Sequence, residues 1–132
     1  MAAEFWKHAA AAVVGGGLGS FLRFAVGAWV VHHHPAAKFP WATLGVNWVG
    51  CLLIGLVYGW LEERTLLGVS LRYFLITGFL GGFTTFSAFG IETIYLFKKG
   101  EAGVAWLYVI TSVAGGLLLA WAGERVSGGV FR

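Results

Sequence analysis

Three polar side chains lie well inside apolar stretches of this sequence, where a charge or an amide is costly. Arg23 interrupts the first stretch, Asn47 the second and Glu92 the third. At membrane depth an unpaired charge costs at least about 2.5–3.5 kcal/mol on insertion scales, so such residues usually face a cavity, a partner or an ion path. The alternatives are that Arg23 extends to the nearer interface, that Asn47 joins two helices by hydrogen bonds, and that Glu92 pairs with a basic residue.

The third stretch contains a segment that is poorly suited to a continuous helix. It reads Gly81-Gly82-Phe83-Thr84-Thr85, and paired glycines followed by β-branched threonines have low helix propensity. A broken helix exposes backbone carbonyl and N–H groups. In lipid these are tolerated only where they are buried in protein or line a cavity, and they commonly bind ions. We therefore expect an interruption of the third helix with a site beside it.

Aromatic and hydroxyl side chains repeat near this segment. Phe83, Phe86 and Phe89 recur at every third residue, so we expect their rings along one helical flank. In the fourth stretch Tyr108 and Ser112 are four residues apart and share a helix face. The phenylalanines either line a path or fill a core, and the hydroxyls either form a hydrogen-bonding track or bond the backbone four residues earlier.

These residues have to be carried by membrane-spanning helices. Hydrophobic residues make up 58% of the 132 residues and charged residues 11%, against roughly 25% charged residues in a soluble domain. This composition excludes a soluble globular enzyme and a disordered chain. The sequence predicts one transmembrane domain over residues 1–132, with four helices long enough to cross roughly 30 Å of hydrocarbon, over residues 9–31, 41–61, 71–97 and 104–122.

The cations are divided almost evenly between the two sides of such a bundle. Four spans place both termini on one side, which then carries five cations against three on the other, with Arg23 left out. The five are Lys7, Arg64, Arg72, Arg125 and Arg132, and the three are Lys38, Lys98 and Lys99. This bias is weak under the positive-inside rule, so both orientations can insert. The charges form no basic stripe of the kind that binds nucleic acid.

Small residues recur at four-residue intervals in the first two stretches. The two stripes are Gly15, Gly19, Arg23 and Gly27, and Asn47, Cys51, Gly55 and Gly59. Small residues let helix backbones approach closely, which drives helix association in lipid. The run Gly15–Ser20 does not predict a nucleotide loop, because it lies inside an apolar helical stretch. The neighbouring side chains of His32, His33 and His34 diverge, so we expect an interface loop there rather than a metal site.

Three segments together resemble the signatures of the Fluc (CrcB) fluoride channels. They are Gly16–Phe24, Thr43–Gly50 and Gly81–Phe89, in this order and spacing. The resemblance covers the first three spans and the overall length, and the fourth span matches only loosely. It implies an all-α membrane subunit with four transmembrane helices and a broken third helix. It also implies an antiparallel homodimer whose subunits insert in both orientations.

The resemblance further implies roles for particular residues. Two fluoride pores run along the dimer, and a structural sodium ion lies at its centre, held by the backbone carbonyls of Gly81 and Thr84. By motif position the pore residues are Asn47, Phe86, Phe89, Tyr108, Ser112, Thr85, Glu92 and Arg23. The implied function is passive exit of fluoride from the cytoplasm across the inner membrane, which protects the cell from fluoride toxicity.

The chemistry of these residues agrees with that function. Fluoride is small and strongly hydrated, so a pore must replace its water with donors. Asparagine supplies N–H groups, threonine and serine supply O–H groups, and the edges of phenylalanine rings carry positive partial charge. Arg23 would favour anions at the pore mouth. These residues form neither a nucleophile nor a catalytic acid–base pair, so we do not expect an enzyme.

Two other functions stay open on the sequence alone. A small multidrug-resistance-type proton-coupled exporter shares the four helices, the small size and the dual insertion. Such exporters depend on an acidic residue in the first helix, where the expected span of this chain carries Arg23 instead. A non-transporting assembly subunit would account for the glycine stripes, but not for the arginine, the asparagine and the broken helix together.

Overall fold

Helices account for nearly all of the described chain. The computed structural model describes residues 2–58, 61, 65–66 and 69–130. Its elements are α1 (Ala2–His33), α2 (Trp41–Tyr58), β1 (Thr65–Leu66), β2 (Val69–Ser70), the π-helix η1 (Tyr73–Leu80), α3 (Gly81–Phe83), α4 (Phe86–Lys98) and α5 (Ala102–Val130). Within these described ranges, four helical segments are long and apolar enough to cross a membrane: Ala2–His33, Trp41–Tyr58, Tyr73–Lys98 and Ala102–Gly128. The expectation of an all-α protein with four apolar spans is confirmed, and the antiparallel strands β1 and β2 form only a short hairpin between the second and third spans.

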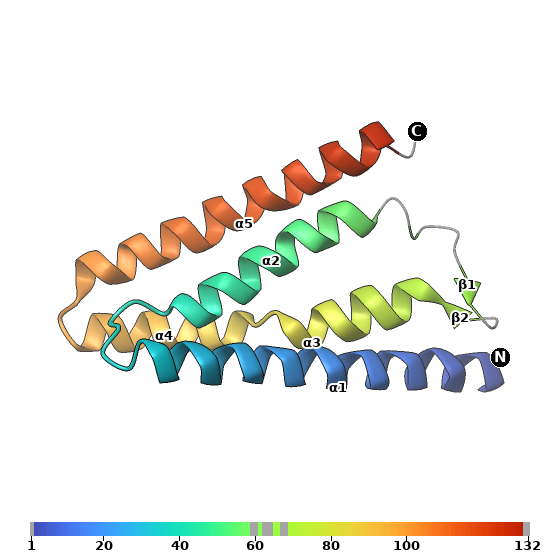
Figure 1. Ribbon diagram of the computed structural model, residues 1–132, viewed down its shortest axis with the longest axis horizontal. Coiled ribbons are helices and arrows are strands. Elements are labelled where there is room, and N and C mark those ends of the chain that lie inside the picture. Colours follow the sequence, from blue (N-terminus) through green and yellow to red (C-terminus); the bar gives the residue numbers. More distant parts are fainter. Residues whose placement is uncertain (1, 59–60, 62–64, 67–68, 131–132) are drawn as a thin grey trace.

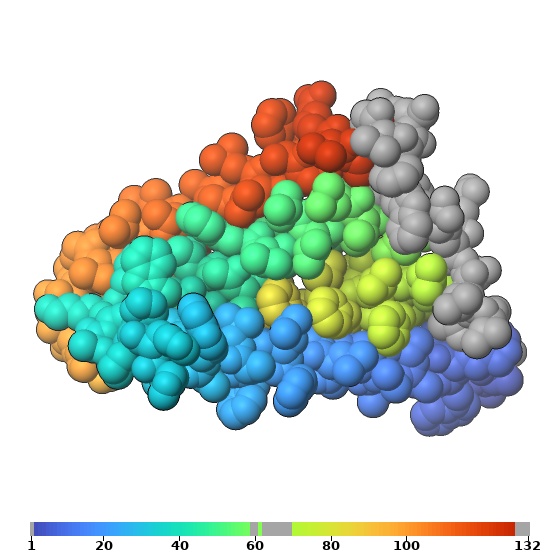
Figure 2. Space-filling model, viewed as in Figure 1, coloured from blue at the N-terminus to red at the C-terminus, as the bar shows by residue number. Residues whose placement is uncertain are grey.

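The four spans are arranged as two pairs of helices. We call η1, α3 and α4 together the third run. α1 packs against η1 and α3 of this run, while α4 contacts α5 and α2, and α2 lies beside α5 (Figure 1). The two pairs meet at the end that carries the start of α2 and of α5, and they diverge toward the end that carries both termini. Figure 2 shows α2 between α5 and the layer formed by α1 and the third run. The divergence leaves the middle of the molecule available for a site.

Glycine allows α1 to pack directly on the third run. Gly15 and Gly19 are the buried residues of α1. A Cβ atom at Gly19 would overlap the carbonyl oxygen of Phe79, and one at Gly82 would overlap the carbonyl oxygen of Gly16. Any larger residue at these positions would push the two backbones apart. Because lipid tails compete with apolar side chains for contact, such close backbone packing is a main source of helix association in a membrane.

The second pair, α2 and α5, packs in the same way. A Cβ atom at Gly55 would overlap the carbonyl oxygen of Ala120, and one at Gly123 would lie 2.5 Å from the carbonyl oxygen of Leu52. The buried Ser127 hydroxyl donates a hydrogen bond of 3.2 Å to the carbonyl oxygen of Gly55. The pair is therefore joined by backbone contact and by one hydrogen bond across the helices.

The two predicted small-residue stripes lie only partly at helix contacts. Gly15, Gly19 and Gly55 do so, whereas Gly27 faces open space and Gly59 lies outside the described residues. Cys51 packs toward α5, where a Cβ atom at Gly116 would lie 3.2 Å from its sulfur. The four-residue spacing identified the helix face but not the length over which the face is in contact.

Two helices extend beyond the apolar stretches that predicted them. The first span was expected from residue 9, but α1 begins at Ala2, and this extension contains an exposed ion pair of 3.0 Å between Glu4 and Lys7 across one helical turn. The last span was expected to end near residue 122, but α5 continues to Val130. Within this extension the Arg125 guanidinium lies 5.3 Å from the centre of the Trp121 ring, which belongs to the expected span. Charged residues end an apolar stretch without ending a helix.

The other two spans also differ from their expected bounds. The third run begins at Tyr73, as a π-helix that the sequence did not predict, and ends at Lys98. The second span was expected to reach residue 61, and α2 is described up to Tyr58, with residues 59–60 outside the description. Arg64 and Arg132, which were counted among the cations of the terminal side, also lie outside it.

An apolar cluster closes the end of the molecule opposite the termini. Its buried members are Leu44, Leu96, Ala105 and Tyr108. At the same end of the molecule, an ion pair of 2.6 Å joins Lys38, between α1 and α2, to Glu101, between α4 and α5. The hydrogen bond that Lys38 donates to the Glu101 carboxylate raises the pKa of Lys38 above its ordinary value. Both connections at this end are thereby tied to one another.

Candidate functional site

The third run is interrupted at two threonines. α3 ends at Phe83, α4 begins at Phe86, and Thr84 and Thr85 between them are extended, with φ/ψ of −86°/160° and −151°/117°. The Thr85 hydroxyl accepts a hydrogen bond of 3.2 Å from the Ala88 N–H and so caps α4. Threonine is a favoured residue at this capping position. We call Thr84 and Thr85 the break.

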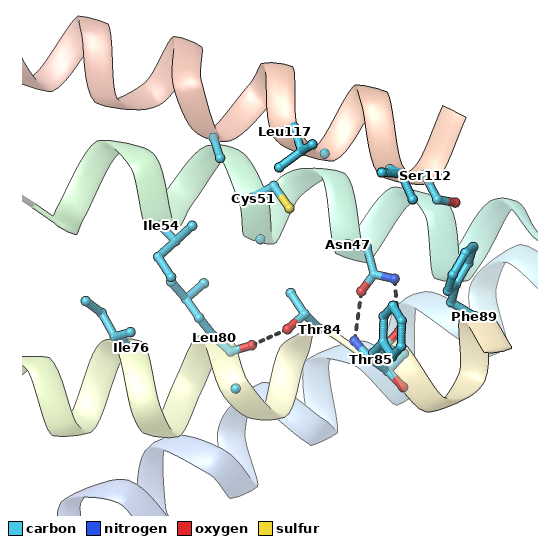
Figure 3. A pocket seen from close by; sticks show the side chains of 16 residues that line it. Asn47, Cys51, Ile54, Ile76, Leu80, Thr84, Thr85, Phe89, Ser112 and Leu117 are labelled. Carbon is cyan, nitrogen blue, oxygen red and sulfur yellow. Dashed lines mark hydrogen bonds between the residues drawn. The ribbon is translucent and has the colours of Figure 1, made fainter. Parts of the chain in front are cut away.

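Asn47 of α2 binds the break with both ends of its amide. Its Nδ2 donates to the Thr85 carbonyl oxygen at 3.0 Å, and its Oδ1 accepts from the Thr85 N–H at 2.8 Å. Figure 3 shows the side chain directed at Thr85, with both hydrogen bonds drawn. One amide hydrogen of Asn47 is left over from this pair. The amide therefore joins two helices and still offers one donor.

Arg23 and Ser20 of α1 approach the break from the other side. The Arg23 Nε donates to the Gly82 carbonyl oxygen at 3.0 Å, and the Ser20 hydroxyl donates to the same oxygen at 3.4 Å. The half-buried Arg23 thus has a backbone partner inside the protein instead of extending to the interface. Side chains from two helices hold the interrupted backbone.

A cavity of about 490 Å³ opens between α2, the third run and α5. We call it the break cavity. The predicted site residues that line it are Asn47, Gly81, Thr84, Thr85, Phe86, Phe89 and Ser112. Figure 3 shows Asn47 on α2, Thr84, Thr85 and Phe89 on the third run, and Ser112 on α5 around this cavity. The structure thus brings seven of the ten predicted residues to one cavity.

Ser112 is the polar side chain of this cavity that lacks a partner. Its Oγ atom is buried and has no hydrogen-bond partner among the residues that the structure describes. A buried hydroxyl without a partner costs free energy of about 1–3 kcal/mol. By contrast, the Thr111 hydroxyl bonds the Leu107 carbonyl oxygen at 2.7 Å, four residues back. Bonding to the backbone four residues earlier therefore occurs at Thr111 and not at Ser112, and the hydrogen-bonding track stays a prediction.

Two of the three phenylalanines lie together on the cavity wall. Phe86 is 82% exposed, and its ring centre lies 5.5 Å from that of Phe89. Phe89 in turn lies 5.2 Å from the ring of the fully buried Tyr108. The expectation that Phe83 would share this flank is wrong: Phe83 is buried and stacks on Phe79. The break changes the direction of the chain between Phe83 and Phe86, so the spacing of three does not carry across it.

Glu92 accepts hydrogen bonds from two hydroxyl groups. The Thr43 hydroxyl donates to one carboxylate oxygen at 2.8 Å, and the Tyr108 hydroxyl donates to the other at 2.7 Å. The basic partner considered from the sequence is not seen among the described residues, where the ion pairs are those of Lys7 and Lys38. The Tyr108 ring packs against the Phe89 ring, and the Tyr108 hydroxyl donates to Glu92.

A second cavity, of about 670 Å³, lies between α1, α2 and α4. Arg23, Thr85 and Glu92 of the predicted set line it, together with Ser20 and Thr43. Thr85 lines both cavities, so the break separates them. Polar groups of both charges face this second space.

Three residues that hold the site were not assigned a role from the sequence. Ser20 binds Gly82, Thr43 binds Glu92, and the Trp48 indole N–H donates to the Thr111 carbonyl oxygen at 3.0 Å. Ser20 and Thr43 carried a signal, because a hydroxyl stands three or four residues before Arg23 and Asn47 on the same helix face. Trp48 carried none, because its position opposite Gly115 depends on the helix pairing.

The three adjacent histidines lie away from this site. His33 donates from Nδ1 to the Trp29 carbonyl oxygen at 2.8 Å, and His32 meets the His33 ring edge-on. All three are exposed at the end of α1. The three histidines therefore lie at the C-terminal end of α1 and do not line either cavity.

Comparison with known proteins places this arrangement in a family. Residues 10–124 match the sequence model described as "CrcB-like protein, Camphor Resistance (CrcB)". A protein of Azotobacter vinelandii named fluoride-specific ion channel FluC is 50% identical over 113 residues, which are 86% of this chain and 90% of that protein. A Pseudomonas putida protein of the same name is 52% identical over 114 residues, 86% of this chain and 91% of its own.

A third relative, from Flavobacterium psychrophilum and of the same name, is 46% identical over 110 residues, covering 83% of this chain and 88% of its own. The resemblance drawn from the three sequence segments is confirmed. The extent of the family match and the identity along nearly the whole length of these relatives lead to one conclusion: this chain belongs to the CrcB family.

Proposed function

We propose that this chain forms a fluoride-selective channel through which fluoride leaves the cytoplasm passively. The observation that carries the proposal is the convergence of the Asn47 amide, the Phe86 and Phe89 rings and the buried Ser112 hydroxyl on one cavity. The names of the relatives, fluoride-specific ion channels over nearly their full length, support the same function.

The cavity offers what a dehydrated small anion needs. The remaining Asn47 N–H and the unpartnered Ser112 O–H are donors that replace water. The ring edges of Phe86 and Phe89 add weak positive poles. Binding to such poles is shallow enough for the ion to leave, which conduction requires. The Arg23 side of the break adds positive charge to the second cavity.

The proposed working unit is an antiparallel homodimer with both orientations in one membrane. Two features support it: the near-even split of cations, and the exposure of Phe86 and Gly81 on one side of the break cavity. A second copy packed on this side would cover the apolar rings and complete the wall of the cavity. Reporter tags on the C-terminus, read from both sides of the membrane, test this; a single orientation for all copies would exclude it.

The family implies a sodium ion at the dimer centre, and the backbone carbonyls of Gly81, in α3, and Thr84, in the break, fit one. In a continuous helix the Gly81 carbonyl would bond the Thr85 N–H and the Thr84 carbonyl would bond the Ala88 N–H. Here the Thr85 N–H donates to Asn47 and the Ala88 N–H donates to the Thr85 hydroxyl. Both carbonyls thus lose their helical donors, and hard cations prefer oxygen ligands. We propose that Gly81 and Thr84 of each subunit would hold the ion, which would fix the break without lying on the anion path.

The setting follows from the family and from the four apolar spans. The chain is a multi-pass membrane protein, and we place it in the inner membrane of a bacterial cell. A passive channel is not an enzyme, because no bond is made or broken. Nothing in the comparisons favours the proton-coupled multidrug exporter.

Growth in fluoride tests the proposed function in cells. A bacterial strain that lacks its own fluoride exporters should regain growth in millimolar fluoride when it expresses this chain. The control is the same strain with the same chain carrying Asn47→Ala, expressed at equal membrane levels. Rescue by the wild-type chain alone supports the channel, whereas failure of a well-expressed wild-type chain to rescue would contradict it.

A further inference from the structure

The backbone carbonyl groups near the break differ in their hydrogen-bond partners. The Gly82 carbonyl oxygen accepts from Arg23 Nε at 3.0 Å and from the Ser20 hydroxyl at 3.4 Å, on the side of α1. Gly81 and Thr84 line the break cavity, and Gly82 does not. Two side chains of α1 therefore bind the Gly82 carbonyl, whereas the neighbouring Gly81 and Thr84 lie at the break cavity.

We propose that Arg23 is a positioning residue for the cation site. By holding the Gly82 carbonyl toward α1, its Nε–H selects the carbonyls of Gly81 and Thr84 as the ligands of the ion. This inference rests on the proposed function, and specifically on the sodium ion at the break. It assigns to Arg23 a role that differs from attracting anions at a pore mouth.

The opposite side of the break is held in a complementary way. Asn47 Oδ1 accepts a hydrogen bond of 2.8 Å from the Thr85 N–H. This bond keeps that N–H from bonding the Gly81 carbonyl. Without Arg23 the Gly82 carbonyl would keep only the longer hydrogen bond of 3.4 Å from Ser20, and we expect the backbone to shift toward a better donor, because a poorly satisfied polar group is costly. Arg23 from α1 and Asn47 from α2 thus keep the break in one conformation.

The geometry assigns this role to the hydrogen bond and not to the charge. A positive charge close to a bound cation weakens its binding by Coulomb repulsion. If Arg23 contributed only charge, the charge would oppose the ion. A neutral donor at the position of Nε should therefore serve the site at least as well as the guanidinium does.

Three substitutions separate the donor from the charge. Arg23→Gln places an amide nitrogen at the same distance along the side chain as Nε and removes the charge. Arg23→Lys keeps a charge but places a methylene group where Nε stood. Arg23→Met removes both donor and charge. Arg72→Gln is the matched control, because Arg72 is exposed and bonds Tyr58 at 3.2 Å, outside both cavities.

The readout is sodium affinity of the purified dimer. Sodium chloride is titrated against N-methylglucamine chloride at constant ionic strength, and binding is followed by ²³Na line width and by the midpoint of thermal unfolding. Arg23→Gln and Arg72→Gln should bind sodium within about twofold of the wild type. Arg23→Lys and Arg23→Met should bind it about tenfold more weakly, the scale of one hydrogen bond to a charged donor. Size-exclusion profiles check folding, and the Gln and Lys variants decide the question even if the Met variant does not fold.

Two results would overturn the inference while leaving the proposed function in place. One is equal sodium affinity in all Arg23 variants. The other is normal affinity in Arg23→Lys together with loss in Arg23→Gln, which would show that charge matters and the donor does not. A wild-type protein that binds no sodium yet conducts fluoride would overturn both the sodium site and this inference, and would leave the fluoride channel standing.

Discussion

The crossing of α1 with the third run and the break that follows it are neighbours, but they bury backbone in different ways. At the crossing, Gly15 and Gly19 let one helix backbone rest on the other, and each helix keeps its own hydrogen bonds. At the break, two residues leave the helix, and Asn47 and Arg23 bind the backbone groups that are exposed. The first arrangement depends on the absence of side chains and the second on two particular side chains.

The helix crossing therefore stabilises the fold, whereas the break belongs to the proposed ion site. Close packing of small residues is the ordinary means of helix association in lipid, so it has no need of a polar group. An interrupted backbone is tolerated in a membrane only where protein or a cavity satisfies it. Substitutions at the crossing should therefore act through side-chain volume, and substitutions at the break should act through the loss of hydrogen bonds.

The largest effect is expected at the crossing. Gly19→Val would force a branched side chain into the Phe79 carbonyl and should destabilise the protein by more than about 3 kcal/mol, because the overlap is with backbone. We expect little monodisperse protein in size-exclusion chromatography. Gly17→Ala is the control, because Gly17 has nothing within 4 Å of the added methyl group, and it should leave the yield unchanged. Normal folding of Gly19→Val would refute the packing account.

The next effect is expected at the break. Asn47→Ala removes both hydrogen bonds to Thr85 and leaves its N–H without this partner, at a cost of about 1–3 kcal/mol. Fluoride efflux from liposomes should fall at least about tenfold, which equals about 1.4 kcal/mol. Thr93→Val is the control, because among the described residues the Thr93 hydroxyl bonds the Phe89 carbonyl four residues back and no group of the site. Unchanged efflux in Asn47→Ala would separate the break from conduction.

A smaller loss is expected on the cavity wall. Phe86→Ile and Phe89→Ile remove the positive ring edges and keep apolar contact, so efflux should fall several-fold at matched dimer content. Phe86 is mostly exposed in the subunit, whereas Phe89 also loses its contact with Tyr108, worth about 0.5–1.5 kcal/mol. Phe97→Ile, at the far end of α4 against Trp106, is the control and should conduct normally. Normal efflux in both cavity variants would make the two rings packing residues only.

The smallest effect is expected at Tyr108, which packs against the cavity residue Phe89. Tyr108→Phe removes the hydroxyl that donates to Glu92 and keeps the ring under Phe89. Stability should fall by about 1 kcal/mol and efflux by no more than about threefold, because the hydroxyl points to Glu92. Thermal unfolding and efflux on the same preparation check this. Complete loss of efflux would show that the Tyr108 hydroxyl contacts the ion itself.

The sequence predicted the spans and the neighbourhood of the site because both depend on local signals. Long apolar stretches with few charges are typical of membrane helices, and the glycine pair with two threonines indicated the segment where the chain is extended. The helix ends were less predictable. Glu4, Lys7 and Ser127 lie in helical extensions that contain polar residues, which an apolar stretch cannot include.

The hydrogen-bond partners could not be predicted, because they depend on how the helices pair. Asn47 was expected to present donors, and one of them is taken by Thr85. Arg23 was expected near anions, and its Nε binds the Gly82 carbonyl. Phe83 was expected beside Phe86, but the change of direction at the break places it against Phe79. The roles of these residues toward fluoride and sodium stay predictions.

Fluoride efflux from liposomes is the measurement that tests the central claim most directly. The purified wild-type protein is reconstituted at low density into vesicles loaded with potassium fluoride or potassium chloride, and valinomycin starts the efflux, which ion-selective electrodes record. We predict rapid loss of fluoride, retention of chloride and no requirement for an imposed pH gradient. Retention of fluoride by vesicles that contain folded protein, or efflux only under a pH gradient, would contradict the account.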